Sequence, residues 1–185
     1  MMDFFGLNDD FDEGLSKSNT AIFTAVDIFQ GQAGYEFIKN WAIKKDVSGE
    51  KKENNIILSK FTEINHKESG YEITQAILLI VYINNKTDLY VDFNEILENE
   101  VLSRNVNVEY KIDDKKEVVS TWLISKNLKA VFSSSPIELI KQLMPANKIT
   151  FKVQKYGTDK FVETYLVLDG LSEAVKSIKK ACRWS

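Results

Sequence analysis

Three acidic residues in the middle of the chain are spaced in a way that could hold a divalent cation. Asp88 and Asp92 fall in the segment 88–93, which has the composition of a β-strand, and Glu95 follows it. Side chains at even spacing along a strand share one face, and carboxylate oxygens are ligands that Mg²⁺ accepts. Such a site would fit a small metal-dependent hydrolase or nuclease. Ordinary surface alternation produces the same pattern more often, so this enzyme is the alternative prediction and not the main one.

Other residue types with catalytic potential are better explained by local structure. His66, the only histidine, lies in a polar turn without cysteine neighbours, which is a poor context for a triad or a metal site. Ser133–Ser135 lack the glycines of a nucleophile elbow and precede a proline, as helix-capping serines do. Asp113-Asp114, followed by two lysines, is typical of a hairpin turn. We therefore predict no enzymatic activity, no cofactor and no metal.

The first 16 residues form an acidic arm in which aromatic and aliphatic residues alternate with acids. Short segments of this composition fold on partner proteins, and a loose solubilising tail is the equal alternative. The basic residues of the C-terminal segment, near Trp184, would attract the arm electrostatically. The partner-binding residues that we predict are Phe4, Phe5, Asp9, Asp10, Phe11, Asp12 and Trp184.

Composition narrows the functional classes. The chain has 185 residues, 44% hydrophobic and 28% charged, with a net charge of −3. These values predict one mixed β/α domain over residues 17–185 after the arm, and they disfavour nucleic-acid binding, which needs a basic face. The longest apolar run covers only residues 76–83, whereas a membrane-spanning helix needs about 20 residues. An acidic start and a single cysteine favour the cytoplasm, or the periplasm if a native leader is missing.

The elements that must position these residues are mostly strands. Residues 22–33 follow a cap at Ser18 or Asn19 and carry apolar residues at helical spacing, and a further helical turn is predicted over residues 35–38. Alternating or β-rich segments then predict strands at residues 41–44, 56–64, 71–83, 88–93, 106–110, 118–125, 129–132, 149–154 and 161–168. The segment 77–81 lacks polar alternation and is predicted to be buried on both faces.

Two helices complete the prediction. Ser135, Pro136 and Glu138 have the spacing of a capping box, so a helix is expected from there to about residue 144. Asp169 is predicted to cap a final helix whose apolar face carries Leu171, Val175, Ile178 and Cys182. The fold class is therefore α+β: a mainly antiparallel β-sheet or two-sheet sandwich with an N-terminal helix, one inserted helix and a C-terminal helix.

From Trp41 onward the order of short motifs resembles the VasI-like family of type VI secretion-associated proteins and their prophage-encoded relatives. The most distinctive motif is the end of the chain, from Leu168-Asp169-Gly170-Leu171 to Ala181-Cys182-Arg183-Trp184. The other matching segments are Trp41 with Asp46 and Ser48, residues 57–59, 85–91 and 108–113, Trp122 with Ser125, and residues 137–144.

This resemblance implies a non-enzymatic protein-binding module, an accessory or inhibitor protein of bacterial or phage origin with a protein partner of unknown identity. The family carries no catalytic residues that could be transferred. It does imply a cysteine in the strand before the Asn-Lys-Thr turn, paired with the C-terminal one. Here that strand reads Val81-Tyr82-Ile83, so the chain departs from the family at this point, as a cytoplasmic relative would.

Overall fold

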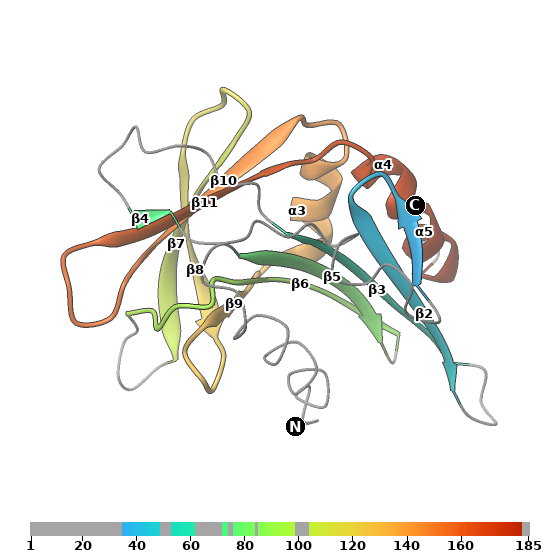
Figure 1. Ribbon diagram of the computed structural model, residues 1–185, viewed down its shortest axis with the longest axis horizontal. Coiled ribbons are helices and arrows are strands. Elements are labelled where there is room, and N and C mark those ends of the chain that lie inside the picture. Colours follow the sequence, from blue (N-terminus) through green and yellow to red (C-terminus); the bar gives the residue numbers. More distant parts are fainter. Residues whose placement is uncertain are drawn as a thin grey trace.

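The computed structural model describes residues 35–48, 53–61, 72–73, 76–83, 85–98 and 104–182, and most of them lie in strands (Figure 1). These strands join into one sheet of 11 strands in the order β1-β2-β3-β5-β6-β9-β8-β7-β10-β11-β4. All neighbours pair antiparallel except β4 and β11, which pair parallel. The strands are β1 Tyr35–Ile38, β2 Trp41–Ser48, β3 Glu53–Phe61, β4 Glu72–Ile73, β5 Ile77–Ile83, β6 Lys86–Asp92, β7 Asn105–Ile112, β8 Val118–Ile124, β9 Ala130–Phe132, β10 Lys148–Gln154 and β11 Phe161–Val167.

The predominantly antiparallel sheet confirms that part of the predicted fold class. The strands form one continuous hydrogen-bonded sheet and not two separate ones. The hairpins β5–β6 and β10–β11 were predicted from the sequence and are confirmed, with Ile83 opposite Lys86 in the first. Residues 77–82 are buried, as their uninterrupted apolar run predicted.

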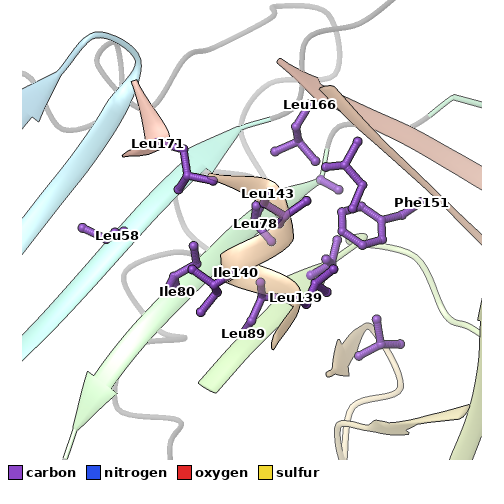
Figure 2. Packing of buried hydrophobic residues seen from close by; sticks show 14 of the residues in the cluster. Leu58, Leu78, Ile80, Leu89, Leu139, Ile140, Leu143, Phe151, Leu166 and Leu171 are labelled. Atoms are coloured by element: carbon purple, nitrogen blue, oxygen red, sulfur yellow. The ribbon is translucent and has the colours of Figure 1, made fainter. Parts of the chain in front are cut away.

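The inner face of the sheet carries the main core. The helices α3 Pro136–Leu143, α4 Leu171–Ala174 and α5 Lys176–Cys182 contribute to this core, and Figure 2 shows the α3 side chains lying among residues of the sheet. Leu171, Val175 and Ile178 are fully buried, which confirms the predicted face of the C-terminal helical segment. The labelled core residues are Leu58, Leu78, Ile80, Leu89, Leu139, Ile140, Leu143, Phe151, Leu166 and Leu171.

One predicted helical turn and one predicted strand were wrong. Tyr35–Ile38 is not a helical turn but strand β1, which pairs with β2 so that Tyr35 lies opposite Lys44. Its Tyr-x-Phe spacing fits a strand, and pairing with β2 gives its backbone groups partners. The segment 71–83 is not one strand, because β4 and β5 pair with different neighbours, β11 and β3.

The structure also differs from the prediction at both helix caps. The Ser135 side chain makes no capping hydrogen bond, and its backbone N–H donates to Oγ of Ser133 at 3.2 Å. Asp169 does not cap the final helix, because Gly170 occupies that position with a left-handed backbone, and the helix is interrupted at Val175. The predicted arm over residues 1–16 and the predicted helix over residues 22–33 lie outside the described residues.

Candidate interaction surface

A groove of about 410 Å³ lies on the outer face of the sheet, opposite the face that packs on the helices. It crosses β7, β8, β10 and β11 and is bounded by the segment that follows β6. We call it the outer groove. Its lining residues are Glu98, Asn105, Val106, Asn107, Glu109, Val119, Gln154 and Phe161.

Strand alternation places the polar side chains in the outer groove. Along β7, Val108 and Ile112 are buried in the core, whereas Asn107 and Glu109 alternate with them on the other face. The register aligns Asn107 with Thr121 of β8, whose hydroxyl donates to Oδ1 of Asn107 at 3.1 Å. Amide and carboxylate groups from neighbouring strands therefore meet on one surface.

An ion pair lies at one side of the outer groove, between Glu109, which lines the groove, and Lys152, which does not. Nζ of Lys152 donates to Oε2 of Glu109 at 2.6 Å, and the two side chains are only 20% and 23% exposed. The same ammonium lies 4.5 Å from the centroid of the Phe161 ring, within the range of a cation–π interaction. Because both charges are partly shielded from water, they hold one geometry better than an exposed pair does.

A second cavity of about 250 Å³ continues beyond this ion pair, and Glu117 and Glu163 are among its lining residues. The pKa of Glu163 is raised, mainly because burial penalises its charged form and also because Glu117 is close, while Lys152 acts in the opposite direction. In the outer groove itself the only ionisable lining residues are Glu98 and Glu109. Lys152 balances the charge of Glu109, so Glu98 supplies most of the negative charge of the groove and suits a ligand that brings positive charge.

The rim of the outer groove is fixed by hydrogen bonds. Oε2 of Glu98 accepts the backbone N–H of Gly157 at 2.9 Å, and Nε2 of Gln154 donates to the carbonyl oxygen of Thr158 at 2.9 Å. These contacts hold the β10–β11 turn against the segment after β6. The opening of the groove is thus shaped before any ligand arrives.

Apolar side chains border the groove on β8. Val119 is 62% exposed and Leu123 is 58% exposed, and both lie on the outer face with Thr121 between them. Val119 also lines the groove. Apolar side chains next to a polar, partly shielded surface are a common arrangement in protein–protein interfaces.

The groove was not found from the sequence. The predicted partner-binding residues Phe4, Phe5, Asp9, Asp10, Phe11, Asp12 and Trp184 all lie outside the described residues. The alternation of asparagine and glutamate with valine in β7 was a usable signal. In β8, however, apolar residues occupy both faces, so its sequence does not tell which one is exposed.

The acidic residues of the alternative prediction are engaged in other contacts. Asp88 and Asp92 share the outer face of β6, as predicted, but Oδ2 of Asp88 pairs with Lys86 at 3.0 Å. Oδ1 of Asp92 accepts the backbone N–H of Asn94 at 2.8 Å, and Glu95 pairs with Lys155 at 3.2 Å. In the part of the chain that the structure describes, no group of three or more His, Cys, Asp or Glu residues is placed to hold a metal ion.

Several residues of the distinctive motifs tie remote parts of the chain together. Nε1 of Trp41 donates to the backbone oxygen of Asp169 at 3.0 Å, and Nζ of Lys39 contacts Oδ1 of the same residue at 2.5 Å. Nζ of Lys60, on a buried side chain, donates to the backbone oxygen of Val167 and lies 5.6 Å from the centroid of the Trp41 ring. We call Lys39, Trp41, Lys60 and Asp169, together with Gly170, the β2–α4 clamp. The motifs at Trp41 and Asp169-Gly170 therefore have a structural role.

The comparisons with known proteins agree with this architecture. Residues 32–184 match the family of type VI secretion system proteins described as VasI and EvfG. The chain belongs to this VasI family, as its sequence motifs indicated. A comparison with curated proteins found no match.

A solved structure has a similar fold. The crystal structure of invasion associated protein B from Bartonella henselae superposes with a TM-score of 0.53 at 12% sequence identity, covering 81% of this chain and 99% of that one. At this identity the likeness concerns the fold alone. Among the described residues no helix is long and apolar enough to cross a membrane.

Proposed function

We propose that this chain is a non-enzymatic accessory protein of type VI secretion that acts by binding another protein through the outer groove and the adjoining face of β8. Family membership supports the association with the secretion system. The observation that carries the binding role is the pair of exposed apolar side chains, Val119 and Leu123, beside a preshaped groove lined mainly by polar side chains. Apolar anchors surrounded by polar groups supply most of the affinity in many interfaces.

The lining of the groove defines the chemistry of the partner. Glu98 would attract a lysine or arginine, while Asn107 and Gln154 offer amide groups that can bond to a peptide backbone. Val119 and Leu123 would pack on an apolar residue next to that basic side chain. We therefore expect a docking segment that combines one or more basic residues with an apolar one.

The acidic arm is a second proposed contact with the partner, because aromatic residues alternate with acids in residues 1–16. Its charge is also negative, so the same basic partner would satisfy both surfaces. The arm and the groove can be separated experimentally, since variants in β8 leave the arm unchanged.

The proposal is tested with Val119→Asp and Leu123→Asp, used as bait in pull-downs from a bacterial lysate that contains a type VI secretion system. Both side chains are exposed, so the variants should fold, and each should reduce recovery of the wild-type partner at least tenfold. Ser172→Asp, an exposed position on α4, adds the same charge far from the groove and serves as the control. Equal recovery of the partner by wild type and both β8 variants would rule out this face as the binding surface.

A further inference from the structure

A second cluster of buried apolar residues lies on the outer face of the sheet, away from α3, α4 and α5. We call it the outer apolar cluster. None of its five members is more than 4% exposed. Partly buried residues pack around it: Tyr35, Phe37, Ile57, Ile83 and Tyr90. The members themselves are Ala42, Phe61, Ile77, Leu79 and Val81.

Strand β5 is thus buried on both faces, for two different reasons. Leu78 and Ile80 point inward, into the core to which α3 contributes. Leu79 points outward between its sheet neighbours Ser59 and Tyr90, and it is still only 4% exposed. Neighbours within a sheet shield the edges of a side chain but not its tip, so a large leucine at this exposure needs a covering layer. No described helix contributes a residue to the cluster.

The chain carries a suitable cover directly before the sheet. The described part begins with β1, whose Tyr35 and Phe37 pack on the cluster, so the chain enters the described sheet beside it. In that segment Ile22, Val26, Phe29 and Ala33 recur at helical spacing and would form one apolar face. The segment and the cluster are therefore adjacent in the chain and both apolar.

The dimensions also agree. A helix of about 16 residues is roughly 24 Å long at 1.5 Å per residue. The five strands from β1 to β6 in the sheet order span about 19 Å, at roughly 4.8 Å per strand spacing. One helix can therefore cross the whole cluster. β5 lies about 14 Å from β1, so the residue of the apolar face nearest β5 is Ile22, about 17 Å from residue 33 along the helix.

We propose that residues 18–33 form an amphipathic helix that docks on the outer apolar cluster of the same chain. It makes a third layer on one half of the sheet, opposite the layer of α3, α4 and α5. The outer groove on the other half of the sheet stays open. This inference does not depend on the proposed function, because it concerns a different set of strands.

The test is a double-mutant cycle on the full chain, with Tm measured by thermal unfolding. Ile22→Ala and Leu79→Ala should each lower Tm on the order of 10 °C, because each removes large buried apolar surface. If the two side chains touch, the double variant should lose clearly less than the sum of the two shifts. Leu78→Ala is the matched control, since Leu78 is the next residue but faces the inner core. Its combination with Ile22→Ala should be additive.

Two outcomes would overturn the proposal. Additive Tm shifts for the pair Ile22 and Leu79 would place the segment elsewhere. The second outcome combines additive Tm shifts with a concentration-dependent dimer, seen by light scattering, that Leu79→Asp dissociates. It would assign the cluster to contact with a second copy of this chain. Thr24→Asp, on the opposite side of the predicted helix, should leave Tm within about 2 °C of wild type. A fall in Tm as large as that caused by Ile22→Asp would contradict the proposed helix face.

Discussion

The hydroxyl oxygen of Thr87 lies 3.5 Å from the thiol sulfur of Cys182, and this contact joins the β5–β6 hairpin to the last turn of α5. Tyr82, directly opposite Thr87 in the hairpin, places its hydroxyl 3.4 Å from the backbone oxygen of Ala181 and 2.9 Å from Oδ1 of Asn85. The family resemblance implies a disulfide between this strand and the C-terminal cysteine. In this chain polar side chains make the same connection without a covalent bond.

The Thr87–Cys182 contact predicts that a disulfide can be introduced there. Thr87→Cys should place a second sulfur near the position of the hydroxyl, close enough to bond to Cys182 after a small shift. The bond would close a loop of 95 residues, and loops near 100 residues give up to about 4.7 kcal/mol of stabilisation. We expect a higher Tm after oxidation that returns to the wild-type value on reduction.

The control for this disulfide is the double variant Thr87→Cys with Cys182→Ser, which keeps one thiol and should gain nothing on oxidation. Thiol counting by mass spectrometry reports bond formation directly. Two unreacted thiols in the oxidised Thr87→Cys protein would show that the hairpin and α5 do not approach as described.

Gly170 is predicted to be the glycine least tolerant of substitution among those with a described environment. Its φ is +85°, and an added Cβ would lie 3.3 Å from Cβ and Cδ of Lys39 and 3.4 Å from the backbone oxygen of Ile38. Gly157 has a similar φ of +66° but open space around it. Gly157→Ala should lower the free energy of unfolding only by the conformational strain of an alanine at this φ, about 1–2 kcal/mol. Gly170→Ala should lower the free energy of unfolding, measured by chemical denaturation, clearly more than Gly157→Ala does. Equal decreases for the two variants would contradict the close packing of the β2–α4 clamp.

The strands that could be predicted from the sequence are those whose signals are local. In the β5–β6 hairpin the signals are close together in the sequence: the apolar run of β5, the turn at Asn85 and the alternating residues of β6. The β10–β11 hairpin is equally local. The position of β9 between β6 and β8 could not be predicted, because its pairing with β6 joins residues 40 or so positions apart. The same holds for the parallel pairing of β4 with β11.

The errors at the helix caps and the missed groove have related causes. Asp169 has the right residue type for a cap, yet Lys39 and Trp41 occupy its carboxylate and backbone oxygen, and both are distant in sequence. The groove is composed of residues from four strands and a loop, so no single segment carries its pattern. Tertiary contacts therefore decided both features, and local propensity could not reveal them.

The Lys39–Asp169 contact predicts a pH effect. The hydrogen bond from Lys39 is the largest cause of a lowered pKa of the Asp169 carboxyl, which Lys60 and the backbone N–H of Gly170 lower further. An acid whose pKa is lower in the folded state stabilises that state above its unfolded pKa, here 3.8, and loses this contribution as the pH falls through the folded pKa.

Lys39→Met should therefore raise the pKa of Asp169, as measured by NMR titration of its carboxyl carbon, and should reduce the loss of stability below pH 3.8. Lys45→Met is the matched control, because Lys45 pairs with Glu36 at 2.7 Å and not with Asp169. An Asp169 titration curve that is identical in wild type and Lys39→Met would show that this ion pair does not form in solution.

The acidic arm is the last feature with a clear test, through deletion of residues 1–13. These residues carry five acids and no base, whereas Lys176, Lys179 and Lys180 lie on α5. Exposed charge pairs contribute only about 0–1 kcal/mol each, so any docking of the arm on its own chain must come mainly from Phe4, Phe5 and Phe11. If the arm binds a partner, the deletion should leave Tm unchanged and abolish the complex recovered in pull-downs. If the arm docks on its own chain, Tm should fall measurably. Unchanged Tm together with unchanged partner recovery would contradict both roles and reduce the arm to a solubilising tail.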